Sequence, residues 1–183
     1  MNKDRFADMS CSVARTAALI ADPWALLVLR DLFLGLARFD ELRRDLDIAT
    51  NVLADRLDRL RAAGLVVREP YRQRPVRHEY HLTDAGRDLY GVVLSLLAWG
   101  DRHLAVDGVP MRLVHKTCGQ PCTPTVTCDH CGETLVDEAV EVLPGPGGRD
   151  APGTTVIARK LFGAQEHAVD AGESDIPEAA TRP

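Results

Sequence analysis

The 183-residue chain has no long hydrophobic run, although 45% of its residues are hydrophobic. The longest apolar stretches, around Trp24 to Leu29 and Gly91 to Trp99, are shorter than the ~20 residues that a membrane-spanning helix needs. The first residues, Asn2-Lys3-Asp4-Arg5, contain no apolar core of the kind found in secretory signal peptides. We therefore expect a cytoplasmic protein with no membrane partner. Its length suits one domain with a hydrophobic core and a small appendage.

The sequence also lacks the residue patterns of an enzyme, and it contains no internal repeat. No nucleophile stands beside a base, no phosphate-binding loop is present, and no paired carboxylates are placed for acid–base chemistry. We therefore expect no enzymatic activity and no catalytic residue. The five cysteines, in a reducing compartment, favour metal or redox chemistry over structural disulfides.

Positive charge is in short supply too, because the formal net charge is -5, which at first argues against a nucleic-acid partner. The distribution of charge weakens that argument. Residues 1–106 carry a net charge of +1, and residues 107–183 carry -6. Residues 38–77 contain 10 arginines and 7 acidic residues, a local net charge of +3. This modest excess is compatible with DNA binding.

Hydrophobic periodicity predicts a mainly α-helical domain with one β-hairpin. The expected helices are Cys11 to Ala21, Trp24 to Leu34, about Arg38 to Leu46, one that follows the turn Asp47 to Thr50 and runs through Ala62, and Thr83 to about Leu104. The hairpin is expected to pair Leu65–Val67 with Val76–Leu82 around a polar loop at Pro70 to Pro75. A short helix, a turn, a longer helix and an arginine-tipped hairpin, in this order, predict a winged helix-turn-helix. The second helix of that motif fits the major groove of DNA.

The second helix of this motif has a polar outer face. Leu53, Leu57 and Leu60 recur at helical spacing and are expected to point inward. Asparagine can bond adenine through two hydrogen bonds and arginine can bond guanine in the same way, while arginines on a hairpin suit phosphate or the minor groove. The expected DNA-binding residues are Arg38, Thr50, Asn51, Arg56, Arg59, Arg72, Arg74 and Arg77. The alternative for any one of these arginines is that it only solvates a small domain.

Seven short motifs resemble the HxlR family of bacterial regulators. In chain order they are Cys11-Ser-Val-Ala-Arg, Trp24-Ala-Leu-Leu-Val-Leu-Arg-Asp-Leu, Arg38-Phe-Asp-Glu-Leu-Arg, Val52-Leu-Ala-Asp-Arg-Leu, Ala63-Gly-Leu-Val, Tyr80-His-Leu-Thr-Asp-Ala-Gly and Ala98-Trp-Gly. The resemblance covers residues 11–100. It implies a MarR-like winged-helix homodimer, built from the first helix and the long helix after the hairpin, that binds a palindromic operator in double-stranded DNA. The family often has a serine cap before the recognition helix, but Ala49 stands there, so Thr50 or Asp47 is the expected cap.

Cys11 stands at the expected N-terminus of the first helix. Unpaired backbone N–H groups and the helix dipole stabilise a thiolate at such a place, which makes the thiol more reactive. In several HxlR-type regulators the matching cysteine senses oxidants, quinones or aldehydes, and the resemblance implies the same redox-sensing role for Cys11. The alternative is a small buried residue that packs the dimer interface.

A cysteine-rich segment follows the long helix, with Cys118-Gly-Gln-Pro-Cys122 and Cys128-Asp-His-Cys131-Gly as its two pairs. Four soft ligands in two tight turns suit tetrahedral zinc. His115 stands three residues before Cys118, so the expected metal ligands are four of His115, Cys118, Cys122, Cys128 and Cys131. The resemblance of this segment to zinc-ribbon tails on some HxlR-like proteins favours the set with His115. A structural zinc ion is expected, and a redox dithiol or a ribbon that has lost its metal are the alternatives.

The expected fold class is mainly α with a small β-hairpin wing, that is, a winged helix-turn-helix plus a small cysteine-rich ribbon module. Residues 1–106 are the DNA-binding and dimerisation domain, 107–143 the zinc-ribbon-like module, and 144–183 a flexible tail in which only Val156 to Phe162 is suited to dock locally. The expected function is a sequence-specific transcriptional regulator, a dimeric repressor that responds to a redox, quinone/aldehyde or small-molecule signal. The alternative is a zinc-ribbon protein-interaction module without specific DNA binding.

Overall fold

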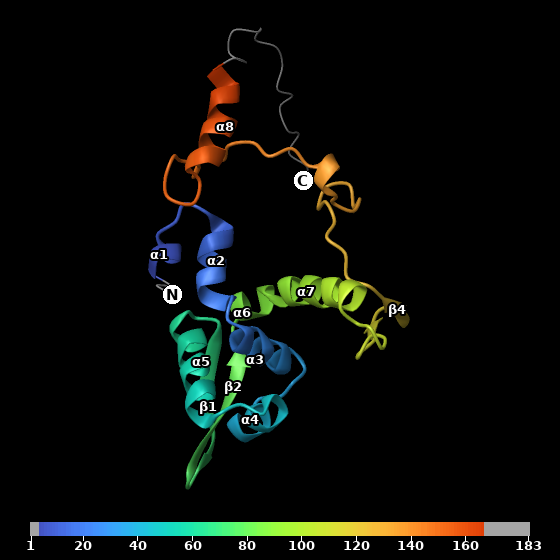
Figure 1. Cartoon of the computed structure of the whole chain (residues 1–183). Coiled ribbons are helices and arrows are strands. Elements are labelled where there is room, and N and C mark those ends of the chain that lie inside the picture. The colour runs from blue at the N-terminus through green and yellow to red at the C-terminus, as the bar shows by residue number, and fades with distance from the viewer. Residues whose placement is uncertain (1–3, 167–183) are drawn as a thin grey trace, which may run out of the picture. The chain divides into compact units, whose positions relative to one another are not determined.

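The computed structural model describes residues 4–166 and divides into two compact units (Figure 1). The larger unit is residues 19–137, and the smaller unit combines residues before 19 with residues after 137. The main hydrophobic core lies in the larger unit, where its buried side chains form one cluster.

Three helices form the centre of the larger unit: α3 (Pro23–Phe33), α4 (Phe39–Leu46) and α5 (Thr50–Ala62). Each confirms the helix predicted from periodicity. Helix α3 contacts both of the others and the hairpin, which explains why its sequence is apolar nearly all round. The most deeply buried apolar side chains come from all three helices: Val28, Leu29, Leu42, Leu53, Leu57 and Leu60.

Strands β1 (Val66–Gln73) and β2 (Val76–Leu82) form the antiparallel hairpin of the wing, whose base packs on the core helices (Figure 1). The loop predicted at Pro70 to Pro75 was too long. Pairing continues through Gln73, with a bulge directly after Pro70. Proline has no N–H to donate to the ladder, and a bulge is one of the few places where a strand tolerates it. The wing is therefore a longer hairpin than its composition suggested.

The single long helix predicted after the wing is two helices, α6 (Asp84–Asp88) and α7 (Tyr90–His103). Thr83 caps α6, because its hydroxyl oxygen accepts the N–H of Gly86 at 3.0 Å. The N–H of Leu89 donates to the carbonyl oxygen of Gly86 at 3.2 Å, a tight turn that ends α6. The chain then continues as α7, in which no residue is buried.

The cysteine-rich segment forms a second small hairpin, β3 (Leu113–His115) paired with β4 (Gln120–Cys122). An isolated antiparallel bridge joins Thr127 to Thr134 further along. Residues 107–137 contain no buried side chain, so this segment lacks a hydrophobic core of its own.

The smaller unit contains α1 (Asp4–Ala7), most of α2 (Ser12–Ile20) and α8 (Thr155–Glu166), and the 3-10 helix η1 (Asp137–Ala139) lies at its boundary. Helix α8 lies inside the segment predicted to be a flexible tail, and residues 167–183 of that segment lie outside the described residues. None of the described helices alone is long and apolar enough to cross a membrane; α2 and α3 reach that length and composition only as a bent pair.

Candidate nucleic-acid interface

The chain passes from α4 to α5 through a short turn at Asp47, Ile48 and Ala49. Asp47 adopts the left-handed conformation, with φ of 46°, and its N–H donates to the carbonyl oxygen of Arg43. Ile48 is buried and fixes the turn to the core. Helix α5 follows an extended Ala49, with no side-chain cap. The prediction that Thr50 or Asp47 caps α5 is therefore wrong, because Asp47 ends the preceding helix and Thr50 is the first helical residue.

The N-terminal turn of α5 presents polar side chains to the outside. Thr50 and Asn51 are exposed, whereas Leu53 and Leu57 are fully buried on the inner face. Because no side chain caps this end, the first backbone N–H groups have no side-chain acceptor. An uncapped helix N-terminus beside threonine and asparagine can donate hydrogen bonds to phosphate oxygens and to base edges.

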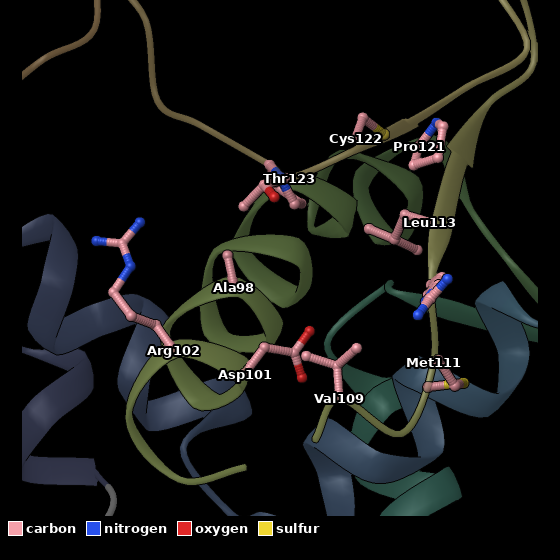
Figure 2. Close-up of a pocket in the computed structure, with 11 residues that line it drawn as sticks. Ala98, Asp101, Arg102, Val109, Met111, Leu113, Pro121, Cys122 and Thr123 are labelled. Carbon is pink, nitrogen blue, oxygen red and sulfur yellow. The ribbon is translucent and has the colours of Figure 1, made fainter.

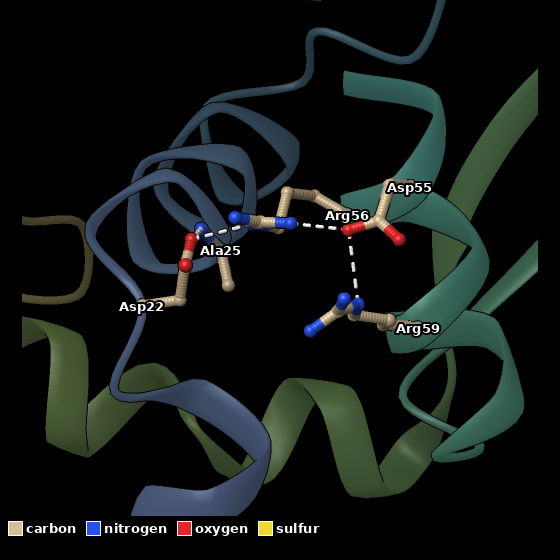
Figure 3. A network of polar contacts seen from close by, with 5 residues as sticks. All are labelled: Asp22, Ala25, Asp55, Arg56 and Arg59. Atoms are coloured by element: carbon tan, nitrogen blue, oxygen red, sulfur yellow. Dashed lines mark hydrogen bonds and ion pairs between the residues drawn. The ribbon is translucent and has the colours of Figure 1, made fainter. Parts of the chain in front are cut away.

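Arg56 points into the protein and not toward the outer face of α5 (Figure 3). Its Nε donates to Asp22 Oδ1 at 2.7 Å, and its Nη1 pairs with Asp55. The hydrogen bond to Asp22 raises the pKa of Arg56. The same Asp22 oxygen accepts the N–H of Ala25 at 3.2 Å and so caps α3. Arg56 thus ties α5 to the start of α3, and this geometry argues against the DNA-reading role predicted for it.

Two other predicted DNA-binding arginines already have carboxylate partners. Arg59 Nε lies 2.9 Å from Asp55 Oδ2, with about half of its side chain exposed. Arg38 Nε lies 2.9 Å from Glu79 Oε1, and its guanidinium stands 4.7 Å from the ring centroid of Tyr71. Arg38 therefore joins the start of α4 to both strands of the wing, while Arg59 keeps an exposed guanidinium on α5.

The wing carries the predicted arginines Arg72, Arg74 and Arg77, and all three are exposed. Arg72 Nε donates to the carbonyl oxygen of Arg74 at 3.1 Å, which orients the side chain along the tip. Within the described residues, no acidic group forms an ion pair with any of the three. Their charge is available to a polyanion.

Arg44 is not among the DNA-binding residues expected from the sequence, because it lies on the solvated side of α4. The structure places it with Arg77 in a groove of about 500 Å³ between α4 and the wing, together with Arg38, Asp40, Tyr71 and His78. The only signal in the sequence was the density of arginine around residues 38–77, because the groove forms only when the hairpin folds back against α4.

Cys11 stands directly before α2 in the smaller unit, and its thiol is half-buried and free. Its carbonyl oxygen accepts the N–H of Arg15 at 3.0 Å, the first hydrogen bond of the helix. This is the helix N-terminus that the sequence predicts for it.

The predicted metal ligands lie in pairs. His115 Nδ1 is 3.4 Å from Cys118 Sγ at the turn of the β3–β4 hairpin. Backbone N–H groups of Cys131 and His130 lower the pKa of Cys128. Across residues 4–166, no three His, Cys, Asp or Glu side chains converge in a way that could hold a metal ion.

Helix, turn, uncapped helix and hairpin together make this chain a winged helix-turn-helix protein. Residues 19–107 match the HxlR-like helix-turn-helix family. The HTH-type transcriptional regulator Rv3095 of Mycobacterium tuberculosis is 44% identical over 137 residues, which are 74% of this chain and 87% of that relative. The chain belongs to the HxlR-like helix-turn-helix family and is a transcriptional regulator of that type.

Two solved structures of candidate transcription factors are similar over most of the chain. PA1607 is 37% identical, with a TM-score of 0.66, over 74% of this chain and 96% of that one. PA1374 from Pseudomonas aeruginosa is 40% identical, with a TM-score of 0.55, over 76% of this chain and 96% of that one. The confirmed fold is therefore the winged helix-turn-helix, and DNA is the partner that this class of regulator implies.

Proposed function

We propose that the protein is a dimeric, sequence-specific repressor that inserts α5 into the major groove of a palindromic operator. The exposed and uncapped N-terminal turn of α5 carries this proposal, because it offers Thr50, Asn51 and free backbone donors together. A recognition helix reads base edges with its first residues, which is where these groups lie.

The contacts divide between reading and positioning. Asn51 is proposed to read a base, since its amide can donate to and accept from adenine. Arg72, Arg74 and Arg77 on the wing are proposed to hold phosphates, which fixes the position of the protein without selecting sequence. Arg38 and Arg56 are reassigned to internal contacts with Glu79 and Asp22, and Arg59 keeps a secondary role at the backbone because it is shared with Asp55.

Footprinting on the gene's own upstream DNA, followed by titration across a salt series, tests this division. Arg74→Ala should weaken binding to all sequences alike and lower the slope of log K against log salt by about 0.9 for each wing. Arg61→Ala is the control, because Arg61 lies at the other end of α5 and is already paired with Asp58 at 2.9 Å. The wing assignment fails if Arg74→Ala leaves the affinity untouched. Absence of any salt-dependent affinity for DNA would instead favour the protein-interaction module.

The proposed dimer uses the apolar face of α7, with α2 as the second element that the family resemblance implies. Helix α7 has no buried residue in one copy of the chain. Its large apolar side chains Leu96 and Trp99 expose 51% and 58% of their surface. A second copy is the proposed occupant, because two-fold symmetric dimers place two recognition helices on the half-sites of a palindrome. Leu96→Glu should shift the mass in solution to that of a monomer. Val106→Glu, beyond the helix and already 94% exposed, should leave it unchanged.

The proposed signal is thiol chemistry at Cys11, which stands at the start of α2. Modification there would alter the dimer and lower operator affinity. In a gel-shift titration with diamide or a quinone, wild type should release the operator and Cys11→Ser should not. An unchanged response of Cys11→Ser would rule out this cysteine as the sensor.

A small apolar effector is the second candidate signal, and one cavity favours it. A space of about 510 Å³ lies between α3 and α7, with Leu26, Phe33, Tyr90, Val93 and Leu97 in its lining. Such a ligand should raise the unfolding temperature of Cys11→Ser as much as that of wild type, since binding in the cavity does not need the thiol.

A further inference from the structure

The cysteine-rich segment contains two turns of the same construction. In the first, His115 ends β3, Cys118 follows in the turn, and Gly119 adopts φ of 69°. The N–H of Gly119 donates to the carbonyl oxygen of His115 at 2.8 Å. The tight turn brings the two side chains together, with His115 Nδ1 lying 3.4 Å from Cys118 Sγ. A left-handed residue at this place favours glycine.

The second turn repeats these features with two cysteines. Cys128 and Cys131 have the same spacing, and Gly132 adopts φ of 80°. The N–H of Gly132 donates to the carbonyl oxygen of Cys128 at 2.8 Å, the same bond over the same number of residues. A further backbone bond of 2.8 Å from Cys128 N–H to Glu133 closes this turn at its base.

Neither turn is explained by packing. Residues 107–137 contain no buried side chain, and the second turn is closed by a single bridge pair, Thr127 and Thr134. A segment this small, without a core, needs another source of stability, and a cross-linking metal ion is one that supplies it. The ligand pairs at the two turns are what such an ion would join.

Cys122 lies in a different setting. In the β3–β4 ladder Cys122 stands opposite Leu113, at the end of the hairpin away from the turn that holds Cys118. It lines a cavity of about 460 Å³ against α7 (Figure 2). Ala98 and Asp101 of α7 line the same cavity. Cys122 therefore lies on the side of the hairpin that faces α7, and the second turn contains no residue that corresponds to it.

We propose that His115, Cys118, Cys128 and Cys131 bind one Zn²⁺ ion that joins the two turns, and that Cys122 is not a ligand. Three thiols lose their protons to solvent as three Zn–S bonds form, and neutral His115 supplies a nitrogen lone pair as the fourth ligand. Because no three ligating side chains already converge within residues 4–166, binding must draw the two turns together. Four protein ligands leave no open position, so the ion is structural.

The test measures zinc in the purified full-length protein and the absorption of the Co²⁺-substituted protein. Wild type should carry one metal ion per chain, with the strong sulfur-to-cobalt absorption of a tetrahedral thiolate site. His115→Ala and Cys118→Ser should lose the metal, while the matched controls His130→Ala and Cys122→Ser should retain it. Circular dichroism checks that the helices persist in every variant, so loss of metal is separated from global unfolding.

Two results would overturn the proposal. Loss of metal in Cys122→Ser with retention in His115→Ala would assign the site to the four cysteines. Metal-free wild type, with all five thiols titrating freely after growth and purification with zinc, would remove the site altogether. Neither outcome depends on whether the protein binds DNA.

Discussion

The partly buried ion pair between Arg56 and Asp22 leads to the most quantitative prediction. The perturbation is Arg56→Met, which keeps the length of the side chain and the helix propensity but removes the charge. The two side chains are only 19% and 17% exposed, and Asp22 would keep the hydrogen bond that it accepts from the N–H of Ala25 at 3.2 Å. Loss of a buried pair costs about 3–5 kcal/mol and loss of an exposed pair about 0–1 kcal/mol. We expect a loss of about 2 kcal/mol in the free energy of unfolding.

Urea unfolding followed by circular dichroism measures this change, with Arg59→Met as the control. Arg59 also pairs with Asp55, at 2.9 Å, but is 53% exposed, so its substitution should cost under about 1 kcal/mol. Where both variants are fully folded, Arg56→Met should keep the base preference of wild type. A loss of under about 0.5 kcal/mol together with an altered base preference would refute this account, because Arg56 would then act on DNA and not on α3.

Further predictions concern the core and the base of the wing. Burial raises the pKa of Asp31 above the usual aspartate value of 3.8, so the folded protein holds the proton of this carboxyl more tightly than the unfolded chain does. The unfolding free energy of wild type relative to Asp31→Asn should therefore fall as pH rises above about 3.8. Parallel stability curves for the two proteins would contradict this. A Cβ at Gly86 would lie 2.1 Å from the carbonyl oxygen of Leu65, so Gly86→Ala should destabilise the protein by several kcal/mol in the same urea assay. Gly91→Ala, in α7 with open space around it, should be neutral or stabilising by up to about 1 kcal/mol, and equal effects at the two glycines would be the contrary result.

Much of the fold could be predicted from the sequence because local patterns determine it. The inward leucines of α5, the apolar α3 and the alternation along β2 each reflect the periodicity of one element. One error arose where a separate segment decides the outcome, because pairing with β2 carries β1 past Pro70. The other is local but has no signal in hydrophobic periodicity: Asp47 adopts the left-handed conformation and ends α4, and α5 begins without a side-chain cap.

The site was harder to predict than the fold, and Arg56 shows why. Its place on α5 suggests an outward-pointing arginine. Its partner Asp22 stands 34 residues earlier, and no local sequence pattern predicts that contact. Arg38 is similar, because its partner Glu79 stands 41 residues later in the sequence. The wing arginines have no carboxylate partner within the described residues. Their exposure could therefore be predicted from the sequence without knowledge of a distant contact.

The central claim is that α5 reads the operator through its first turn, and one measurement tests it most directly. The affinity ratio for the footprinted operator over a scrambled duplex, at a fixed salt concentration, is compared between wild type and Asn51→Ala. Loss of one bidentate base contact should reduce the difference in binding free energy between the operator and the scrambled duplex by about 1–3 kcal/mol for each half-site, while binding to the scrambled duplex stays unchanged. An unchanged ratio in Asn51→Ala, with both proteins folded and dimeric, would contradict the claim.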